Sequence, residues 1–223
     1  MEFSKYYRTD SYADTARRHY RWLQQLDSGV RLPVLLGQDG TALLFEHLEG
    51  HAVEPDDMRC AAIVLGKLHA AAHREYLSSA RLDRPFVVSN ELTVADFLTP
   101  RRSLGSQVRR FRALPVALYK DANVRNFVVQ PTGTAVIDFD ELTLAPFGYD
   151  LAKLIVSCAM THGHFGRTRV RSALDGYNSE LPPSLQCPED RLRQYATLQH
   201  LLTAPYQGRH GYRYSWLDVD SWR

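Results

Sequence analysis

The stretch that decides the fold is residues 119–139, YKDANVRNFVVQPTGTAVIDF. Asp121 and Asn126 lie in its polar part, and Asp138 follows its second apolar run. Apolar runs alternate here with turn residues, which predicts a short strand before the polar loop and two strands joined by a Pro-Thr-Gly turn after it. We therefore expect a hairpin that brings Asp138 back beside the loop.

These residue types suit the transfer of a phosphoryl group. The reaction needs a carboxylate near the incoming hydroxyl, and oxygen ligands for a magnesium ion that bridges the nucleotide phosphates. Carboxylate and amide oxygens are the hard ligands that Mg²⁺ selects. An Asp and an Asn five residues apart often form only a satisfied turn. The second strand that ends in Asp138 favours the functional interpretation.

The flanking segments predict a small first unit and a helical second unit. Apolar spacing predicts an amphipathic helix in residues 13–26, and two strands around an Asp-Gly turn in residues 33–48. Residues 57–76 carry apolar side chains at spacings of three and four, which predicts a long helix at the start of the second unit. Residues 81–112 are expected to form loops with one helix at residues 93–98, and three more helices follow the motif.

Composition excludes several classes of protein. A chain of 223 residues with 44% hydrophobic and 23% charged residues can bury a full core. A net charge of +2 is too small for a typical nucleic-acid binder. No apolar run approaches the ~20 residues of a membrane helix, and the first ten residues lack the apolar stretch of a signal peptide. We expect a cytoplasmic protein that binds neither nucleic acid nor membrane.

Residues 119–155 resemble the core of the aminoglycoside phosphotransferase and choline kinase family, a branch of the protein-kinase-like fold. Upstream, LPVLLGQDGTALLFEHLEG followed by LGKLHA resembles the last strands of the family's small lobe, its adenine-binding hinge and the first helix of its large lobe. The resemblance implies an α+β, bilobal kinase-like fold. Residues 1–50 would form a reduced sheet with one helix, and residues 51–223 a mainly helical lobe with the catalytic loop at 119–140.

The resemblance also implies roles for particular residues, with ATP and Mg²⁺ as cofactors. Asp121 falls on the catalytic aspartate, and Asn126 and Asp138 fall on the metal ligands. The positions that would bind the nucleotide are the hinge residues and a lysine that contacts the α and β phosphates: Glu46, His47, Leu48 and Lys5. Asp150 begins a helix, where capping explains it, and the resemblance implies a structural role for it.

The sequence departs from the family pattern in its first lobe and before the catalytic aspartate. Family members carry two further strands and a phosphate-covering loop before the lysine, so we expect this lid to be missing. The glutamate that braces the lysine would align near Ala16, where only Asp14 and His19 could substitute. Tyr119 and Lys120 replace the family's His-Gly or His-Asn, and Lys120 could pair with an acid or touch a phosphate.

Three functions fit this pattern. The first is phosphorylation of a hydroxyl on a small molecule such as an aminoglycoside, a choline-like alcohol or a sugar. The second is phosphorylation of Ser or Thr in a precursor peptide of natural-product biosynthesis, with a separate lyase subunit and a partner protein that completes the small lobe. The third is a pseudokinase, a binding module that scarcely turns over ATP. The intact trio of Asp121, Asn126 and Asp138 supports an enzyme.

Overall fold

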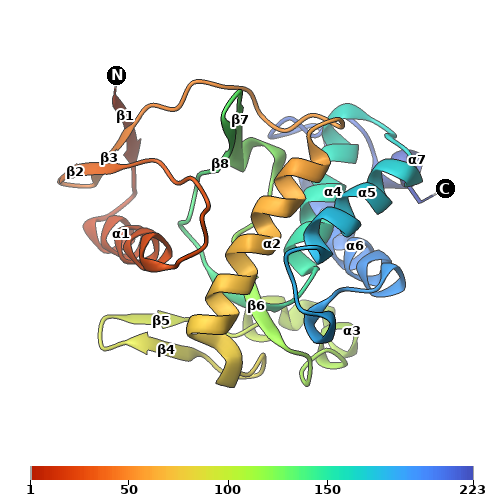
Figure 1. Ribbon diagram of the computed structural model, residues 1–223, viewed down its shortest axis with the longest axis horizontal. Helices are drawn as coiled ribbons and strands as arrows, with labels where there is room; N and C mark the ends of the chain where they lie inside the picture. The colour runs from red at the N-terminus through yellow and green to blue at the C-terminus, as the bar shows by residue number, and fades with distance from the viewer. Residues whose placement is uncertain (1, 223) are drawn as a thin grey trace.

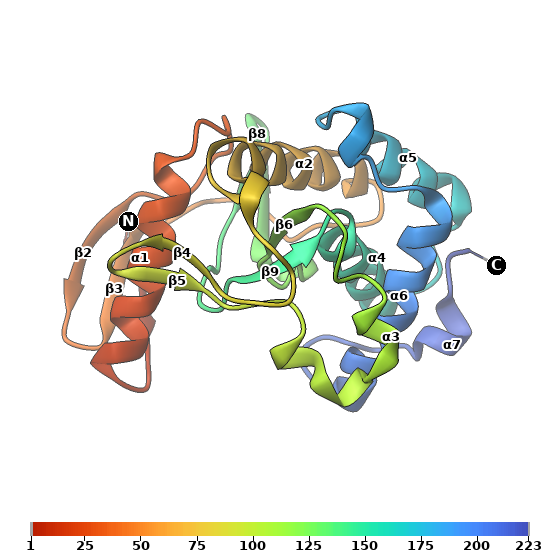
Figure 2. The same ribbon diagram turned by 90° about the horizontal axis from the view of Figure 1, so that it is seen from below.

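The computed structural model describes residues 2–222, which form two lobes (Figures 1 and 2). The small lobe consists of β1 (Glu2–Tyr6), α1 (Asp10–Gln25), β2 (Leu35–Asp39) and β3 (Ala42–Glu46). Its strands form one antiparallel sheet in the order β1-β3-β2.

The large lobe is mainly helical and contains three separate strand pairs. The pairs are β4 with β5, β6 with β9, and β7 with β8. The bounds of the elements are α2 (Met58–Glu75), β4 (Phe86–Ser89), β5 (Leu92–Val94), α3 (Ser106–Arg109), β6 (Val116–Tyr119), β7 (Phe127–Gln130), β8 (Gly133–Val136), β9 (Thr143–Pro146), α4 (Tyr149–His162), α5 (Arg167–Asn178), α6 (Glu189–Thr203) and α7 (Trp216–Val219). This arrangement confirms the expected α+β, bilobal fold class.

Helix α1 forms where its apolar spacing predicted a helix. The side chain of Thr9 accepts a hydrogen bond from the backbone N–H of Tyr12 and caps the helix start. One face of the helix buries Tyr20 and Leu23, and the ring of Tyr20 meets Phe45 of β3 edge-on at 5.1 Å between centroids. The helix is thereby fixed against the sheet that lines one wall of the site.

The core of the large lobe is built around α4. This helix is apolar on nearly all sides, as its sequence LAKLIVSCAM suggests, and its residues from Tyr149 to Met160 are buried. Helix α2 packs closely along α5, with Gly66 of α2 against the backbone of α5. A Cβ placed on Gly66 would lie 2.6 Å from the carbonyl oxygen of Tyr177, so only glycine allows this spacing.

The expectation for residues 81–112 was wrong in part. Strands β4 and β5 form a hairpin there, and Thr93 and Val94 belong to β5 instead of a helix. The carboxylate of Asp96 accepts hydrogen bonds from the backbone N–H groups of Leu98 and Thr99, at 2.8 and 2.7 Å. Such local bonds compete with helix formation and turn the chain.

Two further expectations concern the chain as a whole. The boundary expected at residue 50 stays a prediction, and it falls in the connection between β3 and α2. Across residues 2–222, no helix combines the length and apolar character needed to cross a membrane.

Gly66→Ala is expected to lower the free energy of unfolding by about 1–3 kcal/mol, because the added methyl group forces α2 away from α5. The intrinsic helix preference of alanine acts in the opposite direction, so a net loss identifies the clash. Urea unfolding monitored by circular dichroism measures the change. Gly37→Ala is the control, since its Cβ would lie at an ordinary 3.8 Å from Leu44. Equal stability of the two variants would contradict the close helix packing.

Candidate active site

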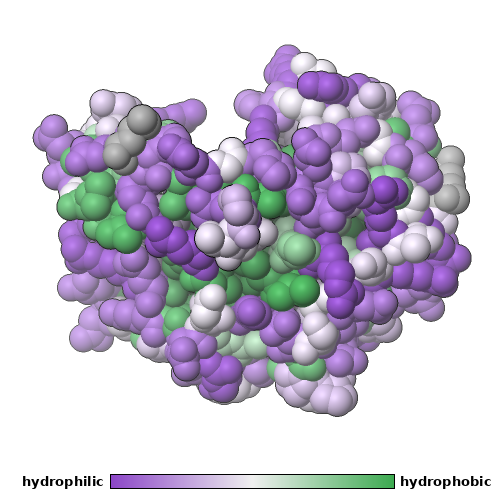
Figure 3. Space-filling model, turned by 45° about the horizontal axis from the view of Figure 1, so that its top comes forward, coloured by the Kyte–Doolittle hydropathy of each residue, from purple (hydrophilic) through white to green (hydrophobic). Residues whose placement is uncertain are grey.

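A cavity of about 410 Å³ lies between the two lobes. Its lining includes Phe3 and Phe45 of the small lobe, and Val128 and Ile137 of the large lobe. Figure 3 shows apolar side chains in the hollow between the lobes. The volume and the mixture of apolar walls with a few polar groups are typical of a small-molecule site.

The structure brings the residues predicted from the sequence together at this cavity. Its lining includes Lys5, Glu46, His47, Leu48, Asn126 and Asp138. Asp121 lies in the adjoining loop, and the side-chain N–H of Asn126 donates to its backbone oxygen at 2.9 Å. Strand β7 starts directly after Asn126, and the turn into β8 returns the chain to Asp138, as the sequence pattern predicted.

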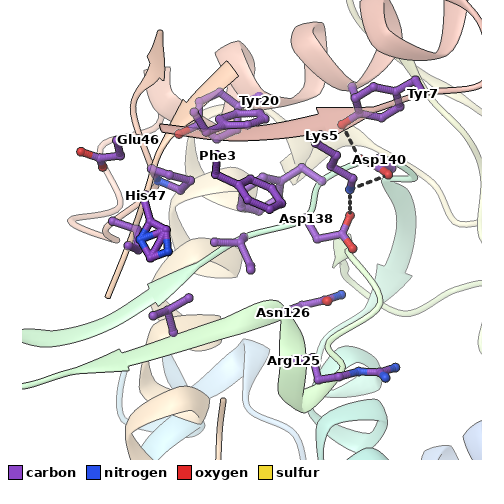
Figure 4. A pocket seen from close by; sticks show the side chains of 17 residues that line it. Phe3, Lys5, Tyr7, Tyr20, Glu46, His47, Arg125, Asn126, Asp138 and Asp140 are labelled. Carbon is purple, nitrogen blue, oxygen red and sulfur yellow. Dashed lines mark hydrogen bonds and ion pairs between the residues drawn. The ribbon is translucent and has the colours of Figure 1, made fainter. Parts of the chain in front are cut away.

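Lys5 joins the two lobes at this cavity. Its ammonium nitrogen lies 2.7 Å from a carboxylate oxygen of Asp138 and 2.7 Å from one of Asp140 (Figure 4). Burial alone would lower the pKa of Lys5, but the charges and hydrogen bonds of Asp138 and Asp140 outweigh burial and raise it. The lysine therefore stays charged at neutral pH and holds β1 against the loop after β8.

Asp140 forms a second ion pair with Lys5, which the sequence did not predict. Of the candidates from α1, Ala16 lines the cavity, Asp14 pairs with Arg17, and His19 contacts the backbone oxygen of Phe139. Within residues 2–222, neither Asp14 nor His19 forms an ion pair or hydrogen bond with Lys5, so neither substitutes for the helix glutamate. The sequence shows Asp140 two residues after Asp138, but the backbone of Asp138 is left-handed, so strand alternation could not predict that both carboxylates face Lys5.

Asp121 and Asp138 both have left-handed backbone conformations, with φ of +62° and +68°. Residues with side chains other than Asn, Asp or His seldom adopt this region, and it costs free energy for most of them. Such strain persists where the surrounding structure enforces it, and it clusters at functional sites. Its presence at both aspartates singled out from the sequence supports their functional interpretation.

The side chain of Asp121 is half exposed and has two donors on one oxygen. The hydroxyl of Tyr119 donates to Oδ1 at 2.9 Å, and the ammonium of Lys153 lies 3.3 Å from the same atom. Burial and the charge of Asp121 raise the pKa of Tyr119, so its hydroxyl stays a donor. Lys153 was not recognised from the sequence, although it stands one helical turn after Asp150 and on the same face of α4.

Lys120 forms no ion pair with an acid in the described part of the chain, so the first of the two roles considered for it is not observed. Its side chain is buried, and its nitrogen has no hydrogen-bond partner within residues 2–222. It lies over the rings of Phe127 and Phe139, at 5.2 and 5.5 Å from their centroids. Burial lowers the pKa of Lys120.

Asp150 has a structural role, but the expectation that it caps a helix was wrong, because the N-cap of α4 is Gly148, which has no side chain to cap the helix. Its fully buried carboxylate accepts hydrogen bonds from the backbone N–H groups of Lys120 and Ala122, at 3.1 and 2.7 Å. These two groups flank Asp121. Asp150 thereby holds the backbone on both sides of the strained residue.

The hinge residues leave backbone groups available at the cavity. Glu46 is anchored by its side chain, which pairs with Arg31 and accepts from the backbone N–H of Val34. The backbone N–H and C=O groups of His47 and Leu48 make no hydrogen bond with another residue in the described part of the chain. These backbone groups are therefore available to form hydrogen bonds with the polar edge of a planar ring.

Asp150→Ala is expected to destabilise the protein by about 1–3 kcal/mol for each of the two buried N–H groups that it leaves without an acceptor. Chemical denaturation measures this loss. Asp83→Ala is the control, because the ion pair of Asp83 with Arg81 lies at the surface. A variant as stable as this control would contradict the structural role of Asp150.

Comparisons with known proteins agree with this geometry. The sequence model described as the phosphotransferase enzyme family matches residues 3–186. No curated protein matches.

Three solved structures share the fold. The choline kinase LicA from Streptococcus pneumoniae is 17% identical, with a TM-score of 0.58, and the alignment covers 89% of this chain and 74% of that one. An aminoglycoside phosphotransferase from Streptomyces rimosus, in complex with ADP and streptomycin, is 18% identical, with a TM-score of 0.55. The alignment covers 88% of this chain and 85% of that one. An amicoumacin kinase bound to AMP-PNP and Ca²⁺ is 14% identical, with a TM-score of 0.63. The alignment covers 90% of this chain and 71% of that one. The family match extends over most of the sequence, and the chain therefore belongs to the phosphotransferase enzyme family.

Proposed function

We propose that this protein is an ATP- and Mg²⁺-dependent phosphotransferase that phosphorylates a hydroxyl group of a small molecule. The observation that supports this most is the contact of Lys5 with Asp138 at 2.7 Å. It joins a strand of the small lobe to the end of the hairpin that follows the catalytic loop. The phosphate-contacting lysine and a metal ligand implied by the sequence thus lie side by side at one cavity.

The residues present fit a nucleotide. The apolar walls of the cavity are suited to a flat base, and the free backbone groups of His47 and Leu48 suit its polar edge. Figure 4 shows Lys5 on the other side of the cavity from His47, where the phosphates would follow. Relatives of the same fold were solved with ADP and with AMP-PNP and Ca²⁺, which supports nucleotide binding here.

The donor set also fits magnesium held together with phosphates. Asp138 and Asn126 supply one carboxylate and one amide oxygen at the same wall of the cavity. Residues 2–222 contain no cluster of three His, Cys, Asp or Glu side chains that could hold a metal by themselves. Mg²⁺ is commonly bound by one or two protein oxygens together with the phosphates of the substrate.

The chain's own residues would act mainly by positioning. Bound Mg²⁺ would offset the negative charge of the phosphates. Lys5 would contact the α and β phosphates and, through Asp140, stay attached to the large lobe. Asp121 would orient the acceptor hydroxyl and accept its proton as the acceptor oxygen bonds to the γ-phosphorus. ADP would leave with the electron pair of the broken P–O bond.

The second candidate, phosphorylation of a precursor peptide with a lyase and a partner protein, is favoured by one observation. Strand β1 lies at the edge of its sheet and, in the described part of the chain, pairs only with β3. Phe3 and Tyr6 on this strand are 52% and 77% exposed. An exposed edge strand is a ready template for an extended strand of another protein. We propose this edge, next to the cavity, as the place where such a partner would add to the small lobe.

The pseudokinase interpretation requires ATP binding without turnover. The convergence of Asp121, Asn126, Asp138 and Lys5 supports turnover instead. Variants of the two aspartates separate the interpretations.

Asp138→Asn is expected to abolish Mg²⁺-dependent nucleotide use, because the phosphate charge loses its metal anchor. Asparagine tolerates the left-handed backbone at this position, so the change removes charge with little strain. Mg²⁺-dependent ATP hydrolysis and titration calorimetry with ATP measure the loss. Asp83→Asn, a surface change remote from the cavity, should behave as the wild type. Full activity of Asp138→Asn would refute the assignment.

Asp121→Asn is expected to leave ATP binding nearly intact and to slow transfer by about 10²-fold to 10⁴-fold, the usual scale for general-base assistance. Single-turnover measurement of ADP formation gives the rate, and calorimetry gives the affinity. Loss of affinity with an unchanged rate would assign Asp121 to binding instead of catalysis.

If a partner strand covers the edge of β1, ATP binding by the isolated chain is expected to be weak and to tighten when the partner is added. The coupling must be reciprocal, so ATP also strengthens the partner complex. Calorimetry with Mg²⁺ and ATP, with and without any copurifying protein, measures both effects. Tight ATP binding by the chain alone, with turnover of a small alcohol, would favour the first candidate over the second.

A further inference from the structure

The two oxygens of Asp121 differ in their surroundings. Both donors, the Tyr119 hydroxyl and the Lys153 ammonium, are directed at Oδ1. Within residues 2–222, no hydrogen bond or ion pair engages Oδ2. The side chain is 51% exposed, so this second oxygen remains open to an incoming molecule.

Lys153 is held in place from several sides. Only 9% of its side chain is exposed, and its ammonium donates to the hydroxyl of Thr203 at 3.2 Å. The ammonium also lies 5.7 Å from the centre of the Tyr212 ring. The hydroxyl of Tyr212 accepts a hydrogen bond at 2.8 Å from the side chain of Asn123, which belongs to the same loop as Asp121. The lysine is therefore enclosed between α4, the catalytic loop and the C-terminal segment.

A charged group at this position is costly for the fold alone. Helix α4 is otherwise mostly apolar where it is buried, and removing an ammonium from water is expensive unless a partner repays the loss. Burial lowers the pKa of Lys153, but the charge of Asp121, followed by Tyr212, more than reverses this effect and raises it. The nearby acid Asp150 is already engaged by the backbone of the catalytic loop. Asp121 is thus the main carboxylate partner of Lys153.

We propose that Lys153 is a positioning residue of the phosphotransferase, which together with Tyr119 fixes Asp121 through Oδ1 and leaves Oδ2 to accept the proton of the acceptor hydroxyl. This inference rests on the proposed function. In the reaction, the O–H bond of the acceptor breaks and its proton passes to Oδ2, while the acceptor oxygen bonds to the γ-phosphorus and ADP leaves. Lys153 stays protonated throughout and offsets the charge that Asp121 would otherwise present to the phosphates.

Thr203 and Tyr212, which hold Lys153 in place, come from the C-terminal part of the chain. Both residues lie beyond residue 186, where the match to the family ends. The loop that carries Asp121 is therefore supported by a segment that lies beyond the residues matched by the family's sequence model. A lysine that only filled space in the core would need neither the loop contact nor the charge.

The ion pair can be tested without activity, because the chain contains only four lysines, Lys5, Lys67, Lys120 and Lys153. Each side chain can be followed through pH by NMR of protein labelled with ¹³C at lysine Cε. Asp121→Asn is expected to lower the pKa of Lys153, since burial remains while the carboxylate is lost. Exposed Lys67 serves as the internal control. An unchanged titration of Lys153 would overturn the proposal.

The catalytic consequence is tested with Lys153→Met, Lys153→Arg and the surface control Lys67→Met. With ATP, Mg²⁺ and water as the acceptor, Lys153→Met is expected to lower kcat by about 10-fold to 100-fold, the scale of misplacing a reacting group. The KM for ATP should stay the same, because Lys153 does not line the cavity. Arginine should restore part of kcat. An unchanged kcat, or a rise in KM that accounts for the whole effect, would overturn the role.

Two further outcomes are separated by design. If Lys153→Met does not fold, Thr203→Val can be used instead, because it removes only the hydroxyl that binds the lysine. This variant is expected to lower kcat and to keep a normal melting curve. An unchanged kcat of Thr203→Val would count against the proposal. If the wild-type chain neither binds nor hydrolyses ATP, the proposed function fails and the role of Lys153 in catalysis fails with it. The NMR measurement would still decide whether the ion pair exists.

Discussion

The geometry of the site depends on one buried carboxylate. Asp150 accepts the backbone N–H groups on both sides of Asp121, and its oxygen lies 3.8 Å from a ring nitrogen of His69 in α2. The other ring nitrogen of His69 bonds to the hydroxyl of Tyr177 in α5, which in turn accepts the N–H of Gly148 before α4. Three helices and the catalytic loop therefore share one buried polar network. The distance between His69 and Asp150 is longer than a hydrogen bond, and this ring nitrogen has no hydrogen-bond partner within residues 2–222.

The small lobe adds a second constraint, because half of the cavity belongs to it. The sheet is only three strands wide, and α1 covers one face of it. Lys5 fixes the sheet to the large lobe through two carboxylates that stand two residues apart. The position that we propose for phosphate contact is thus built from both lobes, and its geometry depends on how the lobes are docked.

The central motif was readable from the sequence because its structure is local. Apolar strands, a Pro-Thr-Gly turn and polar residues at fixed spacing determine where Asn126 and Asp138 lie relative to each other. The hairpin of β4 and β5 was missed because Asp96 captures backbone groups that the apolar spacing had assigned to a helix. The support of Lys153 by Tyr212 was not predictable, since these residues are distant in sequence and carry no shared pattern. Long-range contacts of this kind become visible only once the helices are packed.

The left-handed backbone at Asp121 and Asp138 bears on which replacements natural variation would tolerate. Asparagine and glycine suit that conformation at least as well as aspartate, so the backbone alone gives no reason to retain a carboxylate at either position. Asparagine would remove the negative charges that pair with Lys5 and with the buried Lys153, so its cost lies in the lost ion pairs and not in the backbone. A related chain that carried asparagine at either position would therefore keep the turn and lose the charge.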